Sequence, residues 1–457
     1  MSSGARAVVA ALAGLVACHP SAPPTRTTTI KSCGYRVELS AEGRARVEAS
    51  CKADGPVTFR IAEPALRTSV TSAAPGKDGQ YRADDARLSY DVDLAKLAER
   101  GHDFDRAARF GASFIATMSS VLLVPEPLTS DITVTVEVTA PPPVALSVGL
   151  ARTPAPDRYQ LMAHEIPVAT YFAFGKLAQR TLDIAGSKLE VTRLDGALDQ
   201  SFDDVNAWIA KSAGAVRDFY QAFPVPRASV FVMPRPGRDA VLFGKVLPES
   251  EPGVALLLGE HASRKALYSD WILIHELYHL GFPSFFEEGK WLDEGLATYY
   301  EPIIRVRAGL YTEAELWHEL SSKLPQGLPA FTQLGLERAD DFRGIYWGGA
   351  LACLLADVTA RQRDPKRGLE VGLRALREAG GNASQVWSLA EALGAIDHAL
   401  GAPTLEPIAR EHAERGSAFD LPALLAKLGV RRDARGAVQL SDDAPLSSVR
   451  RAITASP

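Results

Sequence analysis

The sequence predicts an α+β protein of several domains, with strands first, a mixed middle part and helices last. Its 457 residues suggest about three domains at roughly 150 residues each. Alternating segments separated by turns dominate residues 31–197, and helical periodicity dominates residues 364–457. Hydrophobic residues make up 46% and charged residues 23%, as in an ordinary globular chain. The net charge of −5 comes without a dominant basic patch, so no nucleic-acid partner is expected.

The first residues are typical of an export signal. A single arginine precedes an apolar run over residues 7–16, which is too short to span a bilayer. The run ends in Leu15-Val16-Ala17-Cys18, which resembles a bacterial lipobox. The resemblance implies a lipoprotein signal peptide over residues 1–17, lipidation of Cys18 and a lipid anchor in the bacterial envelope, at the outer membrane. A plain secretory signal with a cysteine near its cleavage site is the alternative. Residues 18–30, rich in proline and threonine, are expected to form a tether.

Residues 31–197 are expected to form a β-rich N-terminal domain. The segment 132–138 (Ile-Thr-Val-Thr-Val-Glu-Val) alternates most strictly between apolar and polar residues. Cys33 and Cys51 lie in two further strand-like segments. A disulfide between them could close a hairpin in an oxidising compartment, which would agree with export.

Residues 271–280 (Trp-Ile-Leu-Ile-His-Glu-Leu-Tyr-His-Leu) hold the pattern that carries chemistry. His275 and His279 are four residues apart, so a helix places both imidazoles on one face, where they can bind one Zn²⁺. Glu276 lies beside the first histidine, where a carboxylate can act as general base on a water. The alternative is an ordinary core helix that contains two histidines.

A catalytic zinc site needs three protein ligands, and Glu294 is the expected third. It lies in a second helical segment that follows a short loop, so an antiparallel arrangement would return it to the two histidines. Four other carboxylates compete for this role: Glu287, Glu288, Asp293 and Glu301.

The motif Trp291-Leu-x-Glu294-Gly-Leu-Ala-x-Tyr-Tyr resembles the gluzincin zinc metallopeptidases, whose third ligand is such a glutamate. The segment that begins Leu88-Ser-Tyr-Asp-Val-Asp resembles the N-terminal β domain of the glycyl-aminopeptidase type. The resemblance implies a thermolysin-like catalytic domain over residues 198–363, followed by a helical C-terminal region over residues 364–457 without a PDZ domain.

The same resemblance implies three further roles. Tyr346 matches the tyrosine whose hydroxyl donates to the oxyanion formed during hydrolysis. The apolar strand expected at residues 253–259 would be the sheet edge that binds the substrate backbone. Glu260, in a partial match to the motif that binds a free amino terminus, is the expected substrate anchor; a solvated glutamate at a strand end is the alternative.

These residues predict a zinc-dependent metallopeptidase that hydrolyses peptides or proteins, as an aminopeptidase rather than an endopeptidase. Zn²⁺ would be held by His275, His279 and Glu294, with Glu276 as base. The alternative from another class is a catalytically silent lipoprotein that keeps a peptidase fold to bind peptides or envelope partners. Hydrolysis of a non-peptide amide or an epoxide is a third interpretation.

Overall fold

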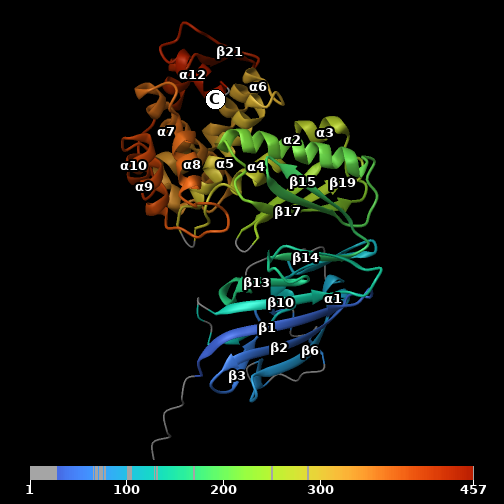
Figure 1. Ribbon diagram of the computed structural model, residues 1–457. Helices are drawn as coiled ribbons and strands as arrows, with labels where there is room; N and C mark the ends of the chain where they lie inside the picture. The colour runs from blue at the N-terminus through green and yellow to red at the C-terminus, as the bar shows by residue number, and fades with distance from the viewer. Residues whose placement is uncertain are drawn as a thin grey trace, which may run out of the picture.

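The computed structural model describes residues 28–455, apart from 65, 67–69, 72–75, 77–78, 100–104, 128, 130–131, 168–169, 249–250 and 286–287. The expected signal peptide and Cys18 therefore lie outside the described residues, as does most of the tether. No helix within the described part is both long and apolar enough to cross a bilayer. Figure 1 shows a β-rich part formed by the first third of the chain and, above it, a part in which helices lie over and beside a further sheet.

The N-terminal part contains three sheets. The largest has the order β12-β13-β10-β1-β2-β6-β4, and the others are β5-β3-β9 and β11-β14-β8-β7. The strand expected at residues 132–138 is β10, whose side chains alternate between buried and half-exposed. The bounds are β1 Ile30–Leu39, β2 Arg44–Ala53, β3 Val57–Arg60, β4 Val70–Thr71, β5 Gln80–Ala83, β6 Arg87–Asp93, α1 Leu94–Ala98, β7 Ala107–Phe110, β8 Ser113–Thr117, β9 Val124–Glu126, β10 Thr133–Thr139, β11 Ala145–Val148, β12 Ala151–Arg152, β13 Arg158–Met162 and β14 Tyr171–Gly175.

Cys33 and Cys51 form the disulfide that the sequence suggested. They are direct cross-strand partners on β1 and β2, with Cα atoms 4.1 Å apart. The third described cysteine, Cys353, is buried and unpaired.

A five-stranded sheet in the order β15-β16-β17-β19-β18 begins the second part of the chain. Its strands are β15 Ala178–Ile184, β16 Ser187–Arg193, β17 Arg227–Arg235, β18 Val241–Leu247 and β19 Gly253–Gly259. Because β15 pairs with β16 and β16 pairs with β17, this sheet begins at Ala178, about twenty residues before the domain boundary that the sequence suggested after residue 197. An alternating strand pattern does not identify the sheet that a strand joins, so the sequence could not show that these two strands pair with β17 through β16.

The edge strand also differs from the expectation. Residues 253–259 do form a strand, β19, but it lies inside the sheet between β17 and β18. The edge that lies against helix α4, Ile272–His279, is β18, Val241–Leu247, which among the described strands pairs with β19 alone. Burial of β19 explains its continuous apolar sequence, whereas the half-exposed β18 carries a mixed one.

The rest of the chain is mostly helical, as expected, and the fold class predicted from the sequence is confirmed. One hydrophobic core runs from Ile184 to Ile453 and so joins the sheet to the C-terminal helices without a break near residue 363. The helices are α2 Phe202–Tyr220, α3 Arg264–Ser269, α4 Ile272–His279, α5 Lys290–Arg307, α6 Glu313–Lys323, α7 Gly349–Arg363, α8 Leu369–Glu378, α9 Leu389–Leu400, α10 Leu405–His412, α11 Leu421–Lys427 and α12 Ser447–Thr454, with π-helices η5 Ala330–Leu334 and η7 Arg343–Gly348, and the hairpin β20 Val430–Arg432 and β21 Val438–Leu440.

The two parts of the chain are joined beside the edge strand. A small apolar cluster includes residues of β8, β14, β17 and β19. Lys245 of β18 forms an ion pair with Asp105 of the N-terminal part, at 2.6 Å. The N-terminal sheets therefore support the strand that lies against the catalytic helices.

Candidate active site

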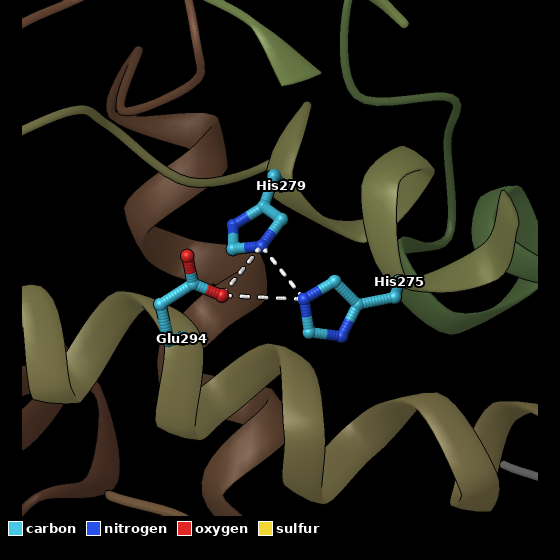
Figure 2. Close-up of side chains that lie close together, drawn as sticks. All are labelled: His275, His279 and Glu294. Carbon is cyan, nitrogen blue, oxygen red and sulfur yellow. Dashed lines mark hydrogen bonds and ion pairs between the residues drawn. The ribbon is translucent and has the colours of Figure 1, made fainter. Parts of the chain in front are cut away.

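Helix α4 carries both histidines on one buried face. The Asp270 carboxylate accepts a hydrogen bond of 2.9 Å from the Leu273 amide and so caps the first turn. His275 and His279 are one helical turn apart, and their residues are only 3% and 5% exposed. The helix expected around residues 271–280 is therefore present, with the imidazoles directed at a common point (Figure 2).

Helix α5 supplies the third side chain. Gly295 and Gly349 let α5 and α7 approach backbone to backbone: a Cβ atom added at Gly349 would lie 1.9 Å from the Trp291 carbonyl oxygen. This close approach fixes Glu294, the neighbour of Gly295, above the two imidazoles. Figure 2 shows Glu294 reaching from a different helix towards both histidines.

The three donor atoms are spaced as a tetrahedral metal site requires. The Oε2 atom of Glu294 lies 3.2 Å from Nε2 of His275 and 3.5 Å from Nε2 of His279, and the two nitrogens are 3.3 Å apart. Ligands about 2.0–2.1 Å from a tetrahedral Zn²⁺ are separated from each other by roughly 3.3–3.4 Å. These three residues are the described group that could hold a metal ion, and their geometry fits zinc.

The rival carboxylates have other positions. Asp293 accepts a hydrogen bond of 2.8 Å from Nδ1 of His279, so it orients that ring instead of joining the donor atoms. Glu301 pairs with Arg305, and Glu288 is exposed. Glu287 lies outside the described residues. Of the described candidates, Glu294 is the third member of the cluster.

The electrostatics of the cluster favour a cation. Three carboxylates, those of Glu276, Asp293 and Glu294, surround the two imidazoles. Burial alone would raise the pKa of Glu294, but its hydrogen bonds with both histidines hold that pKa well below the usual range. Burial alone would lower the pKa of His279, but Asp293 and Glu294 hold it well above its usual value. The site therefore stabilises positive charge in the form of protons or a metal ion.

Glu276 lies between the zinc helix and the edge strand. A Cβ atom added at Gly244 of β18 would lie 2.6 Å from Cγ of Glu276, so only glycine leaves room for this side chain. The Val246 backbone forms a hydrogen bond with the carboxylate. Burial raises the pKa of Glu276 above its ordinary value, which makes it a better proton acceptor. Glu276 thus lies where β18 meets the group formed by His275, His279 and Glu294.

Tyr346 joins the cluster from the π-helix η7. Its ring stacks on His275, with centroids 5.8 Å apart and planes within 6°. A π-helix adds a residue per turn and commonly marks functional sites. Burial raises the pKa of Tyr346, and the charge of Glu294 and a hydrogen bond to it add to this effect. The hydroxyl therefore stays protonated and can donate a hydrogen bond.

Glu260 is the predicted site residue that the structure does not bring to the cluster. It follows β19, and its carboxylate accepts a hydrogen bond of 2.9 Å from the Gly237 amide and lies 3.8 Å from Nε2 of His261. These contacts hold a turn beside β17 and give no support to a role as amine anchor. The sequence did not reveal that Asp293 is the hydrogen-bond partner of His279, nor that β18 is the edge strand. The only signal for Asp293 in the sequence was its position next to Glu294.

Comparison with solved structures shows the fold. An aminopeptidase N family protein from Idiomarina loihiensis matches with a TM-score of 0.67 and 14% identity, over 90% of this chain and 82% of that one. An M1 zinc metallopeptidase from Deinococcus radiodurans matches with a TM-score of 0.51 and 15% identity, over 87% and 96%. A variant of such an enzyme from the same organism, bound to a Tyr-Ser-Ala substrate, matches with a TM-score of 0.51 and 14% identity over the same shares. No family model and no curated protein matches the sequence.

These likenesses and the site define a class of fold: the chain has the architecture of the M1 zinc metallopeptidases, with a β-rich N-terminal part, a catalytic part and helices that follow. This agrees with the gluzincin resemblance of residues 291–300. The identity of 14–15% is too low to carry an activity from those proteins to this chain.

Proposed function

We propose that the protein is a zinc-dependent metallopeptidase that hydrolyses peptide bonds. The observation that carries the proposal is the convergence of two buried imidazoles and the partly buried Glu294 at tetrahedral spacing, with the Glu276 carboxylate and a protonated tyrosine beside them. A bound Zn²⁺ would polarise the substrate carbonyl and lower the pKa of a water molecule.

The residues of the chain perform the remaining chemistry. Glu276 accepts the proton of the attacking water and passes it to the leaving amine, for which its raised pKa is suited. Tyr346 donates its hydroxyl proton in a hydrogen bond to the developing oxyanion. Asp293 keeps His279 in the tautomer whose Nε2 lone pair faces the metal. The free edge of β18 pairs with the substrate backbone.

The finer proposal is aminopeptidase activity, and it rests on the class of the similar structures. The described residues support it weakly, since β18 carries no carboxylate and Glu260 is bound elsewhere. The test is therefore designed to separate trimming of N-termini from internal cleavage.

The test is mass spectrometry of a diverse peptide mixture incubated with zinc-loaded protein, half of the peptides being N-acetylated. Cleavage by wild type and not by Glu276→Gln protein establishes the peptidase. Cuts confined to free N-termini support the aminopeptidase, and cuts inside acetylated peptides overturn it. If zinc-loaded wild type cleaves nothing, the peptidase proposal is rejected, and a silent binding protein or a non-peptide hydrolase takes its place.

We also propose that the chain is exported and anchored through a lipid at Cys18. The sequence of residues 15–18 carries this proposal, and the Cys33–Cys51 disulfide supports an oxidising compartment. Metabolic labelling with a palmitate analogue in a bacterial host tests it. Label in wild type and its loss in Cys18→Ala protein are expected; unlabelled wild type would reject the anchor.

A further inference from the structure

Two of the largest exposed apolar side chains lie at the catalytic residues. The exposed large hydrophobic residues of the described chain are Trp271 (43%), Phe342 (53%), Leu334 (46%) and Phe243 (39%). Single exposed apolar residues are normal on protein surfaces and need no function. The position of Trp271 and Phe342 distinguishes them from the other two.

Trp271 and Phe342 are the ends of a row of four aromatic rings, which we call the ring row. Trp271 contacts the His275 ring edge to face, with centroids 5.4 Å apart. His275 stacks on Tyr346 at 5.8 Å, and Tyr346 packs against Phe342 at 4.3 Å. The two middle rings are the proposed metal ligand and oxyanion donor, so the exposed rings flank the reacting centre.

Phe243 and Leu334 lie outside the ring row. Successive side chains of a strand point to opposite faces, and Gly244 faces Glu276, so its neighbour Phe243 faces away from the catalytic helix. Leu334 belongs to the separate π-helix η5. Because Phe243 belongs to β18, the proposed substrate-binding strand, Leu334 is the control that has comparable exposure without a place in the ring row.

The backbone fixes both ends of the ring row. Trp271 is the residue directly before α4, and the capping carboxylate of Asp270 precedes it. Phe342 is the residue directly before η7, where the Asp341 carboxylate accepts a hydrogen bond of 2.8 Å from the Gly344 amide. Rings attached to capped helix starts are preorganised for binding, so little conformational entropy is lost when a ligand packs on them.

We propose that the ring row selects substrates whose residue beside the reacting bond has a bulky apolar side chain, aromatic or long aliphatic. The inference rests on the proposed peptidase function and deepens it. The substrate side chain would cover Trp271 or Phe342 and exchange exposed ring surface for apolar contact. An acidic side chain at this position would be repelled by the carboxylates of Glu276, Asp293 and Glu294.

The experiment measures binding, so that it does not depend on turnover. Zinc-loaded Glu276→Gln protein is titrated with fluorescently labelled peptides that differ only at one central position, which holds Phe, Leu, Ala or Lys. Each peptide is used with a free and an acetylated N-terminus. We expect the Phe and Leu peptides to bind about tenfold to a hundredfold more tightly than the Ala peptide, since that is the range for burial of one such side chain.

Variants in the same background locate the preference. Phe342→Ala and Trp271→Ala should each reduce the ratio of Phe to Ala affinity by about tenfold, with zinc content unchanged. Leu334→Ala should leave the ratio as it is. Because Trp271 contacts a metal ligand, Trp271→Leu serves as a second variant that keeps apolar bulk and should keep most of the ratio.

The proposal is overturned if the Phe and Ala peptides bind equally, if the Lys peptide binds most tightly, or if both ring-row variants keep the full preference. Failure of the peptidase function gives a different result: wild type then cleaves none of the peptides while Glu276→Gln protein still prefers Phe. That pattern supports the ring row and rejects the reaction.

Discussion

Two buried clusters of charged residues, one on α5, α7 and α8 and the other on α4 and α5, are built in opposite ways. In the first, Arg361 bonds to Asp357 at 3.1 Å and to Glu370 at 2.7 Å, and the Tyr299 hydroxyl donates to Asp357 at 2.7 Å. In the second, Nε2 atoms of His275 and His279 face each other and one oxygen of Glu294. The first cluster contains its own cation, the Arg361 guanidinium, whereas in the second three potential ligand atoms converge on one point.

The difference distinguishes a structural cluster from a functional one. A guanidinium between two carboxylates compensates the charges that burial makes costly, so the cluster around Arg361 is complete as folded. Donor atoms that converge at ligand spacing without a side-chain cation between them are stabilised by an added ion. Burial and charge do not distinguish the two clusters. The guanidinium between the carboxylates of the first, and the convergence of ligand atoms in the second, distinguish them.

The largest effect should come from Glu276→Gln, which keeps the shape of the base and removes its basicity. Turnover should fall by about 10²–10⁴-fold, because that is the usual contribution of a general base, while zinc content stays at the wild-type level. Steady-state kinetics with metal analysis of the same samples checks this. Glu288→Gln, at an exposed neighbouring position, is the control. Full turnover in Glu276→Gln protein would remove it as the base.

In the complete cluster, Arg361→Met should destabilise the fold by about 3–5 kcal/mol, because Asp357 would be left buried without its cation and Glu370 would keep only Arg307. Denaturant unfolding measures the loss. Zinc bound per folded molecule should not change. Arg410→Met, which breaks an exposed pair with Glu406, should have a small effect. Equal stability of the two variants would contradict the structural role of the Arg361 cluster.

Asp293→Asn tests the support of the metal site. The amide can still contact Nδ1 of His279 but no longer supplies the charge that makes the imidazole a stronger ligand. Zinc affinity should fall by about 10–100-fold, with stability of the metal-free protein little changed. Competition with a chromophoric chelator gives the affinity. Unchanged affinity would mean that Asp293 does not act through His279.

Glu251 is a buried carboxylate whose charge is only partly compensated, unlike those of the Arg361 cluster. Its Oε2 lies 3.7 Å from Nε of Arg227, while Oε1 has no hydrogen-bond partner among the described residues. Burial, with the charge of Glu190, raises the pKa of Glu251 to about 7. Between about pH 4.5 and 7 the Glu251 carboxyl is therefore protonated in the folded state and ionised in the unfolded state. The free energy of unfolding consequently falls as pH rises through this range.

Glu251→Gln should remove this loss. At pH 8 the variant should be more stable than wild type by about 1–3 kcal/mol, and the difference should shrink towards pH 5. Thermal unfolding of both proteins across this pH range measures it. A difference that is constant with pH would show that Glu251 does not titrate between these values.

Much of the site was predictable from the sequence, because its parts are close together in the chain. His275 and His279 share one helix, and Glu294 lies on the helix that comes next in the chain after α4. Helical periodicity and one short loop were therefore sufficient to predict that the three side chains meet. The edge strand was not predictable in this way. An edge strand pairs on one side and a buried strand on both sides. Tertiary packing determines that β19 pairs with both β17 and β18 and is therefore buried. The contacts of Glu260 with Gly237 and His261 were likewise not predictable, since they join segments that only the fold brings together.

The most direct test of the central claim is a zinc titration of metal-free protein, with wild type, His279→Ala and Arg361→Met compared. The account predicts one zinc per chain in wild type and in the folded fraction of Arg361→Met, and none held tightly by His279→Ala. A full zinc complement in His279→Ala protein, or no binding by wild type, would contradict it.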